Sequence, residues 1–515
     1  MGVVSASFLG SLTVYQTAQL LLAAFTIIYL IRWSYTAVYN LYFHPLAAFP
    51  GPSHWIIFPI LRQIDIIRGV REHKTRQWHE RYGEVVRCGS DMLTFTHPDA
   101  WKDIYGHGHA ELPKFLGTNQ NGVESIINAR SAQTHFRHRR AMLPAFSDKA
   151  LGEQMGIMNR YIDLLMTRIS EAASDKEGTT DIDRLYNFTT FDLIGDLAFG
   201  EDMGGLSNGE STPWLKRIKT VIRMLPVGLL MSQFFPFLQP LLRRTLRKSG
   251  NEHRAMVEAM VRKRIGNAEF EHRGDFMDQM MRNRGKEGVD LTDEEHAANA
   301  DIMMIAGTET TATLLSFATY MLLTHPEKLD RVREEVRAAF ESREEMTFAS
   351  VSKRLPYLLA CLQETFRLYP PVPIIMFRET LEGQMTSIAG HLVPGKIKVG
   401  VPQLAANTTT ANFHDPHSWT PERWLPSATT DPKSVYFNDR REAVRPFSIG
   451  PRNCIGQNLA YHEMRLIMAR LMWEFDLELD GKSEGWTEGM KVRVFWDKEG
   501  LWVRVREREG MKGEQ

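Results

Sequence analysis

The chain has 515 residues, and its 62 basic side chains balance its 62 acidic ones. This bulk charge indicates neither a nucleic-acid partner nor a strongly acidic one, so we expect no nucleic acid. Length alone would allow roughly three or four domains, but no strong linker divides the chain. The three cysteines, Cys88, Cys361 and Cys454, make no disulfide framework, which fits a reducing compartment and leaves Cys454 available as a ligand.

The N-terminal segment is apolar, since residues 2–31 contain no Asp, Glu, Lys or Arg. As a helix, the run from Leu12 to Ile31 would be about 30 Å long, the thickness of a bilayer core. A cleaved signal peptide is the alternative, but such peptides have a basic beginning and a shorter apolar core. We therefore predict a retained single-pass anchor at residues 1–33, with Arg32 on its cytosolic side.

A proline-rich stretch follows at residues 34–60, where His44-Pro45-Leu46 precedes Phe49-Pro50-Gly51-Pro52. Because proline fixes φ and restricts the residue before it, we predict a stiff, extended tether rather than a helix. An ordinary loop is the alternative. The remaining residues, 61–515, are expected to form one folded unit.

The body of the chain reads as mainly α with small β-sheets. Alternating runs at residues 84–97 and 492–505 predict strands, and most of the chain up to about residue 370 reads as helical. Prolines and glycines are frequent from residue 372 to 453, so helices are expected to be scarce there.

One uncharged stretch, Met224 to Leu242, allows two interpretations. Pro226, Pro236 and Pro240 argue against a helix that crosses a membrane. The segment is then either a buried loop with a short helix, or a surface that dips into a membrane beside a substrate entrance.

A long helix is predicted from Thr292 to His325. Thr292 and Glu295 form a capping box at its start, and Pro326 stops it. Its interior contains Ala306-Gly307-Thr308-Glu309-Thr310-Thr311, a run of weak helix formers that often marks a functional site. An acid beside an alcohol, Glu309 and Thr310, can relay protons from solvent. A helix bend caused by threonine hydroxyls that bond to the backbone is the alternative.

A later helix is predicted to open at Pro356, which suits the first helical position. On it, Glu364 and Arg367 lie three residues apart on one face. Such a pair is common by chance and is usually solvated. The segment Pro421-Glu422-Arg423-Trp424 comes further along the chain.

The most informative segment runs from Phe447 to Gly456, with the sequence Phe-Ser-Ile-Gly-Pro-Arg-Asn-Cys-Ile-Gly. Gly450 and Gly456 allow a tight turn and a close approach to a flat ligand. A helical pattern from Asn458 to Leu471 puts Cys454 near a helix N-terminus, which stabilises a thiolate. Arg452 offers a fork of donors suited to a carboxylate. A small buried cysteine is the alternative.

This run resembles the heme-binding loop of the cytochrome P450 family, and Ala306 to Thr311 is similar to the family's oxygen-binding motif. The resemblance covers nearly the whole chain and implies the cytochrome P450 fold after one N-terminal transmembrane helix. It implies that Cys454 is the axial ligand of heme b iron and that Phe447, Gly450 and Gly456 shape the loop. It also implies that Gly307 admits the cofactor and O₂, and that Thr310 and Glu309 are catalytic.

The resemblance assigns further residues to the cofactor. Glu364, Arg367 and Arg423 would form a buried network that supports folding and heme retention. The heme propionates would be bound by Arg452, His135, Arg139 and Arg378. His135 stands where the family usually has tryptophan, but still offers an N–H donor.

The amino-acid sequence of several segments resembles that of fungal secondary-metabolite members of the family, of the isotrichodermin C-15 hydroxylase type. The implied function is a monooxygenase that oxidises an apolar terpenoid, polyketide or alkaloid with O₂. Its electrons would come from NADPH–cytochrome P450 reductase, because the chain shows no Gly-x-Gly-x-x-Gly motif of its own. The anchor and proline hinge imply the endoplasmic reticulum membrane, with the catalytic domain in the cytosol and lipid as a partner.

Three alternatives differ in chemistry: a heme-thiolate isomerase or dehydratase that uses no O₂, a heme-binding carrier or sensor, and a membrane scaffold without heme. Thr310 counts against the first.

The substrate pocket is expected to draw on residues 105–130, Met224 to Leu242, the helix before Gly307 and Val372 to Phe377. Its expected apolar lining contains Phe115, Ile302, Met303, Ile375, Met376 and Phe377.

Overall fold

The computed structural model describes residues 13–115, 123–266 and 273–508. Parts of the expected regions therefore lie outside the described residues, namely 1–12 of the anchor, 116–122 of the pocket segment, and 267–272 and 509–515 of the folded unit. The described residues are mainly α with small β-sheets, which confirms the predicted class.

Helices make up most of the body, and their bounds in the first half are α1 (Val14–Val38), α2 (Ser53–Ile57), α3 (Pro59–Arg68), α4 (Arg71–Tyr82), α5 (Asp99–Tyr105), α6 (Ala132–Met142), α7 (Asp148–Ser174), α8 (Ile182–Phe199), α9 (Gly205–Asn208) and α10 (Pro213–Phe234). The later helices are α11 (Gln239–Gly266), α12 (Phe276–Met281), α13 (Asp293–Leu323), α14 (Pro326–Ala339), α15 (Phe348–Arg354), α16 (Pro356–Leu368), α17 (Gln403–Thr408), α18 (Pro426–Thr430) and α19 (Gln457–Glu474). Between residues 372 and 453 the helices are short, as the prolines and glycines predict.

The strands form four small sheets, with the bounds β1 (Val85–Gly89), β2 (Met92–Phe95), β3 (Thr179–Asp181), β4 (Arg378–Glu379), β5 (Thr386–Ile388), β6 (His391–Val393), β7 (Lys398–Gly400), β8 (Phe475–Leu479), β9 (Lys491–Val492), β10 (Trp496–Asp497) and β11 (Trp502–Glu507). The largest has the order β1-β2-β7-β4, in which β2 and β7 are parallel and the other pairs antiparallel. A second sheet has the order β3-β11-β8, and β5-β6 and β9-β10 are hairpins. The strands predicted at residues 84–97 and 492–505 are confirmed.

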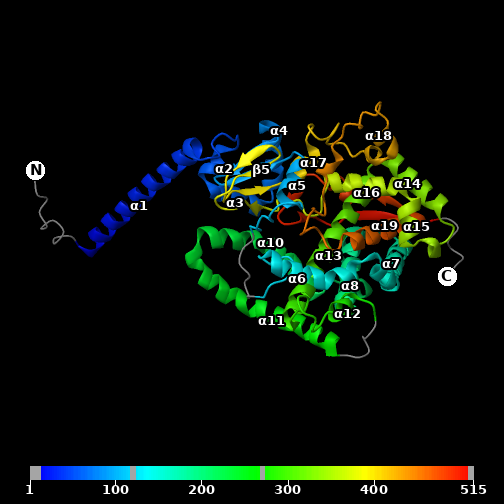
Figure 1. Cartoon of the computed structure of the whole chain (residues 1–515). Helices are drawn as coiled ribbons and strands as arrows, with labels where there is room; N and C mark the ends of the chain where they lie inside the picture. The colour runs from blue at the N-terminus through cyan, green and yellow to red at the C-terminus, as the bar shows by residue number, and fades with distance from the viewer. Residues whose placement is uncertain (1–12, 116–122, 267–272, 509–515) are drawn as a thin grey trace, which may run out of the picture.

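The N-terminal helix projects away from the body (Figure 1). It continues beyond α1 through a π-helical turn, Tyr39–Phe43, so the expected anchor boundary at residue 33 falls inside a continuous helix. Among the described residues, Val14–Phe43 is the one helix long and apolar enough to span a membrane, and it is not buried by the protein.

The proline stretch is not the extended tether that the sequence predicts. Residues 44–49 form turns, and Leu46 is fully buried. The Pro50 carbonyl accepts the Arg87 N–H at 2.7 Å, and the Arg87 guanidinium donates to the Asn40 carbonyl at 2.7 Å. These contacts dock the stretch on β1.

The segment Met224 to Leu242 is also more helical than either interpretation allowed. Helix α10 passes through Pro226, and α11 begins at Gln239. A proline inside a helix removes one backbone bond, and here the Gln63 amide of α3 donates to the Pro226 carbonyl at 3.3 Å. This contact joins α10 to α3 beside the proline.

The centre of the molecule is α13, which crosses the helical part of the body (Figure 1). The predicted capping box of Thr292 and Glu295 is present at its start, and the helix ends at Leu323 before α14 begins at Pro326. From Thr311 to Leu322 every side chain is buried, so this half of α13 is core on all sides. It packs on α8, where the Tyr186 hydroxyl and Thr319 Oγ1 lie 2.9 Å apart.

Candidate active site

The cysteine loop precedes α19 and is fixed by its own backbone. The Cys454 N–H donates to the Phe447 carbonyl at 2.9 Å, which closes the loop. Gly450 has a φ of 79°, and a Cβ there would lie 1.8 Å from the Tyr105 carbonyl oxygen. Glycine is therefore required at position 450 by a left-handed turn and by a close backbone neighbour.

Gly456 differs from Gly450, because the protein itself does not force it to be glycine. It precedes α19 with a φ of −88°, and a Cβ would meet Phe146 at an ordinary 3.7 Å. Its expected role, a close approach to a flat ligand, stays a prediction. Phe447 packs on Phe366 and Tyr461, at ring-centroid distances of 5.3 and 5.1 Å.

Cys454 is accessible, although protein surrounds it on most sides. Burial raises the pKa of the Cys454 thiol, while the Gly456 N–H and the charge of Arg139 partly offset this rise. The N-terminus of α19 and the nearby Arg139 thus lower the pKa of the Cys454 thiol, as the sequence predicts, but burial raises this pKa by more. Burial thus disfavours the thiolate, and a further positive charge such as a metal ion would stabilise it.

The middle of α13 exposes two positions one turn apart, in a helix that is otherwise largely buried. Ala306 is exposed, and the Thr310 hydroxyl is accessible while it donates to the Ala306 carbonyl at 2.6 Å. This is the bond of a threonine hydroxyl to the preceding turn that the sequence offered as an alternative. The same hydroxyl remains available as an acceptor.

Gly307 has a packing role that the sequence did not show. A Cβ at this position would lie 2.5 Å from Ile194 Cγ1 of α8, so any side chain would push α8 and α13 apart. The Thr190 hydroxyl of α8 donates to the Thr308 carbonyl at 3.0 Å beside it. Close contact of two helices is thus sufficient to require Gly307, and its role toward heme and O₂ stays a prediction.

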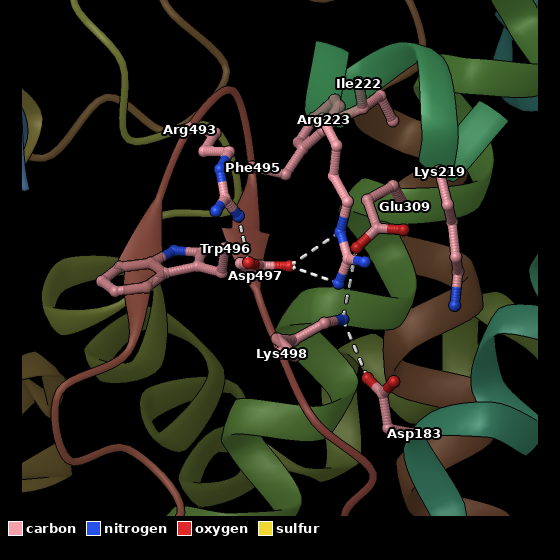
Figure 2. Close-up of a pocket in the computed structure, with 10 residues that line it drawn as sticks. All are labelled: Asp183, Lys219, Ile222, Arg223, Glu309, Arg493, Phe495, Trp496, Asp497 and Lys498. Atoms are coloured by element: carbon pink, nitrogen blue, oxygen red, sulfur yellow. Dashed lines mark hydrogen bonds and ion pairs between the residues drawn. The ribbon is translucent and has the colours of Figure 1, made fainter. Parts of the chain in front are cut away.

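Glu309 points away from Thr310 and does not bond to it. Its carboxylate lies 3.6 Å from Lys498 Nζ and accepts a 3.5 Å bond from the Thr313 hydroxyl. Figure 2 shows this carboxylate in a polar pocket, between residues of α8 and α10 and the segment that follows β9. The predicted acid and alcohol are neighbours in sequence, but they face different surroundings.

The pair Glu364 and Arg367 is buried and bidentate. Arg367 Nη2 and Nε donate to the two Glu364 oxygens at 2.7 and 2.9 Å, and Arg423 Nε donates to Oε1 at 3.0 Å. All three side chains have no exposed surface. The structure therefore brings these predicted residues together, and the alternative of a solvated pair is wrong for them.

A cluster of basic side chains lies beside the cysteine loop and surrounds His135. Burial, and then the positive charges of Arg452, Lys114, Arg139 and Arg378, lower the pKa of His135 to about 3. His135 is therefore neutral and presents one N–H donor. All four propionate-binding candidates from the sequence belong to this cluster.

Lys114 is the member of the cluster that the sequence did not indicate. Burial, followed by the charges of Arg452 and Arg378, lowers the pKa of Lys114 to about 7. Lys114 and Arg378 are paired across an antiparallel bridge, where two like charges destabilise each other. A second anion beside them would remove this repulsion.

The carboxylate within this cluster is Glu111, which forms an ion pair with Arg452 Nε. Four positive side chains thus share one carboxylate among the described residues. Arg139 donates to the Asn453 carbonyl at 2.8 Å, and Arg452 Nη1 to the Ala129 carbonyl at 2.7 Å, so neutral acceptors take up part of the charge. An excess of buried cations beside an accessible thiol fits a flat metal ligand that carries two carboxylates, and heme is such a group.

Two further residues of the site were missed by the sequence. Asp439 accepts from Arg423 Nη1 and balances the second arginine of the buried network. Lys498 pairs with Glu309 from near the C-terminus. Neither residue lies in a motif, so only their positions in the folded chain show their partners.

Comparisons with known proteins agree with this geometry. The family model described as Cytochrome P450 matches residues 49–499. The trichothecene C-4 hydroxylase of Trichoderma arundinaceum is 44% identical over 479 residues, which cover 92% of this chain and 95% of that protein.

Two other hydroxylases are similar over comparable lengths. The averantin hydroxylase of Dothistroma septosporum is 39% identical, with 93% of this chain and 90% of that protein covered. The trichothecene C-15 hydroxylase of Fusarium sporotrichioides is 37% identical, with 90% and 93% covered. The chain belongs to the cytochrome P450 family and is a monooxygenase that uses heme with a cysteine thiolate ligand.

Proposed function

We propose that the chain hydroxylates an apolar secondary metabolite, with Cys454 as the heme ligand and Lys114, His135, Arg139, Arg378 and Arg452 as the propionate site. The observation that carries the site assignment is the cluster of four cations with one carboxylate, Glu111, beside the accessible Cys454 thiol. Two propionates would supply the missing negative charge.

The bound heme supplies the iron at which O₂ is activated. The chain's own residues supply the remaining functions. In this proposal the Thr310 hydroxyl, held by the Ala306 carbonyl, accepts a bond from water or from a protonated group beside the oxygen site. Glu309, in its polar pocket, takes protons from solvent and passes them toward Thr310.

The proposed substrate is largely apolar. Phe115 and Met376 expose large apolar side chains, and the Phe115 N–H donates to the Phe377 carbonyl at 3.3 Å, which places these segments side by side. The exposed Ala306 on α13 would form the small, central part of the lining. Terpenoid, polyketide and alkaloid skeletons all have the size and polarity for such a surface.

We also propose that the enzyme is anchored in the endoplasmic reticulum membrane and receives electrons from NADPH–cytochrome P450 reductase. The apolar helix Val14–Phe43 supports the anchor, and Arg32 supports a cytosolic body. Exposed side chains of α10, including Met224, Leu225 and Leu229, support a second contact with lipid.

One spectroscopic experiment tests the heme site, and one metabolic experiment tests the reaction. The purified, dithionite-reduced chain under carbon monoxide should show the red-shifted absorption band of thiolate-ligated heme. Expression with a reductase in a host that makes candidate metabolites should then give products heavier by one oxygen atom, with O₂ consumed. Conversion of a substrate without O₂ would instead identify an isomerase or dehydratase.

A further inference from the structure

Arg62, in the first half of α3, is a buried arginine without a partner. The residue is 9% exposed, and no hydrogen bond or ion pair joins its guanidinium to another described residue. Arg87 of β1 is buried too, but each of its three guanidinium nitrogens donates to a backbone carbonyl. A buried cation without a partner is unfavourable, and an anionic ligand would satisfy it.

The carboxylates near Arg62 belong to other cations. Glu72 of α4 accepts a 2.8 Å bond from Arg71 Nε. Asp91, between β1 and β2, lies 2.8 Å from Lys398 Nζ. Both acids act on the charge of Arg62 from a distance, but neither forms an ion pair with it. Arg62 therefore leaves one positive charge without a counterion, which a ligand with a single negative charge would balance.

Arg62 lies beside a small apolar cluster. Burial lowers the pKa of Arg62, and the strongest influence of another group on this pKa comes from the Cys88 thiol of β1. Burial raises the pKa of Cys88 to about 11, and Arg62 is the strongest of the charges that oppose this rise. The two side chains are therefore close. Cys88 forms the cluster with Trp55 and Met92, and Phe377 packs against it.

Phe377 joins this cluster to the expected substrate lining. Its carbonyl accepts the N–H of Phe115, and both Phe115 and Met376 expose large apolar side chains. An apolar ligand that extends from Arg62 along the cluster would thus reach the segment that is expected to line the substrate pocket.

The other side of Arg62 lies near the apolar surfaces that we assign to the membrane. The preceding residue, Leu61, is exposed, and the following one, Gln63, donates to the Pro226 carbonyl of α10. The ring of Phe58, just before α3, lies 5.2 Å from that of Trp33 in α1. Arg62 is thus placed where α1 and α10 both approach α3.

We propose that Arg62 binds a carboxylate of the substrate, so that the enzyme acts on an apolar acid with one negative charge. This rests on the proposed function and narrows its substrate class. The planar guanidinium offers a fork of donors that matches a carboxylate. A terminal carboxylate is small enough to reach a largely buried side chain, whereas a phospholipid phosphate is flanked by glycerol and a head group. The apolar skeleton extends past Cys88 toward Phe377.

The test compares acids with neutral alcohols of the same skeleton on the full-length, heme-loaded enzyme. The probes are dodecanoic acid with 1-dodecanol, and abietic acid with abietinol, and their dissociation constants come from the change in the heme absorption spectrum. On at least one skeleton the acid should bind about tenfold or more tightly than the alcohol, because it adds charge-assisted hydrogen bonds. Arg62→Met should remove this preference and leave the affinity for the alcohol unchanged.

Two further variants separate the charge at position 62 from charge elsewhere on α3. Arg62→Lys should keep part of the preference for the acid, since it keeps the charge but loses the fork of donors. Arg68→Met removes an exposed arginine from the same helix and should leave the preference unchanged. No preference for the acid on either skeleton, or an equal preference in wild type and Arg62→Met, would overturn the proposal.

Urea unfolding without added ligand tests whether Arg62 is merely structural. Arg62→Met should leave the urea midpoint unchanged or raise it, because it removes a buried charge that has no partner. Arg87→Met should lower the midpoint, because three backbone carbonyls lose their donor. A fall in Arg62→Met as large as that in Arg87→Met would show a structural role and refute the proposal.

Two other outcomes identify a different ligand or a wrong function. If Arg62→Met weakens binding to vesicles that contain phosphatidylglycerol but keeps the preference for the acid, the site takes a lipid phosphate and the proposal is wrong. A red-shifted carbon monoxide band in every variant would leave the heme site intact in that case. Absence of the band in the wild-type enzyme would instead refute the proposed function itself.

Discussion

At the scale of single residues, Cys454 stands in a loop closed by its own backbone, beside Arg139 and the N-terminus of α19. Burial raises the pKa of its thiol, and a metal ion would displace the proton and stabilise the thiolate. Cys454→Ala should therefore abolish heme incorporation or leave an inactive pigment.

The Cys454→Ala result is measured as heme per protein and by the carbon monoxide spectrum. Cys88→Ala is a suitable control, because Cys88 is a buried cysteine of β1, outside the loop, and burial raises the pKa of its thiol to about 11. Normal activity in Cys454→Ala would contradict the whole assignment.

Thr310 has a role that depends on its hydroxyl and not on its volume. Because that hydroxyl bonds to the Ala306 carbonyl, its loss costs about 1 kcal/mol of helix stability at most and should leave heme binding intact. Thr310→Ala is expected to divert electrons to peroxide, since proton delivery beside O₂ is impaired. The ratio of hydrogen peroxide formed to NADPH consumed measures this, and Thr310→Ser should lie close to wild type. An unchanged ratio in Thr310→Ala would remove Thr310 from the relay.

At the scale of elements, α16 is joined to the segment before the cysteine loop by buried charges. Glu364 accepts five bonds, from two atoms of Arg367, from Arg423, from the Trp424 indole and from the Thr420 N–H. Removing Arg423 leaves Glu364 with Arg367 but leaves the buried Asp439 carboxylate without its cation, and breaking a buried ion pair in this way typically costs about 3–5 kcal/mol. Arg423→Met should thus lower the urea midpoint strongly and release heme.

An exposed arginine in the same region gives the matched control for Arg423→Met. Arg440 pairs with Glu84 at 3.2 Å, with side chains 41% and 43% exposed, so Arg440→Met should cost about 1 kcal/mol or less. Similar midpoints for the two variants would show that the network does not stabilise the fold.

Helices α19 and α13 meet at a buried acid, Glu463, which bonds to Thr311, while its Oε1 has no hydrogen-bond partner among the described residues. Burial raises the pKa of Glu463 to about 8, from 4.5 in an unfolded chain. The folded protein therefore keeps the proton, and its stability falls as pH rises from about 4.5 to about 8, by up to about 1.4 kcal/mol per pH unit.

Glu463→Gln should remove this part of the pH dependence, so the variant gains stability relative to wild type across the window. Urea unfolding at several pH values measures the difference, and Glu478→Gln, on an exposed part of β8, is the control. Parallel curves for wild type and Glu463→Gln would show that Glu463 is not protonated in the folded state.

At the scale of the whole molecule, the sequence predicted what short motifs determine and missed what distant segments bring together. The capping box at Thr292, the stop at Pro326 and the strands near both ends follow from local rules, and each is confirmed. Helix α10 was missed because a proline inside a helix breaks the local rule, and the contact that joins α10 to α3 is not visible in any local pattern.

The residues of the site fall into the same two groups, those that a motif predicts and those that only the fold brings together. Motif residues such as Glu364, Arg367 and Arg423 come together as the family resemblance implied. Lys498 and Lys114 were missed, because their partners lie 189 and 264 residues away along the chain, as the pairs Lys498–Glu309 and Lys114–Arg378 show. Gly307 was assigned to the cofactor, whereas its contact with Ile194 depends on how two helices cross.

The whole molecule also presents two apolar surfaces on the same side. Helix α1 leaves the body on the side where α10 and α11 join (Figure 1), and α10 exposes Met224, Leu225 and Leu229 by 56, 44 and 44%. A helix from Val14 to Phe43 is about 45 Å long, more than a bilayer core, so its last turns would extend to the interface. Both surfaces would then contact one membrane.

Deletion of residues 2–43 should make the enzyme extractable by alkaline carbonate, while it still sediments with phospholipid vesicles at neutral pH. Further change of Met224, Leu225 and Leu229 to serine should abolish this residual binding, because each loses apolar area that lipid would cover. The matched control changes three apolar residues of similar exposure on other segments to serine, namely Met385, Leu392 and Val435. Residual binding that survives the α10 changes, or is lost equally in the control, would place the second lipid contact elsewhere.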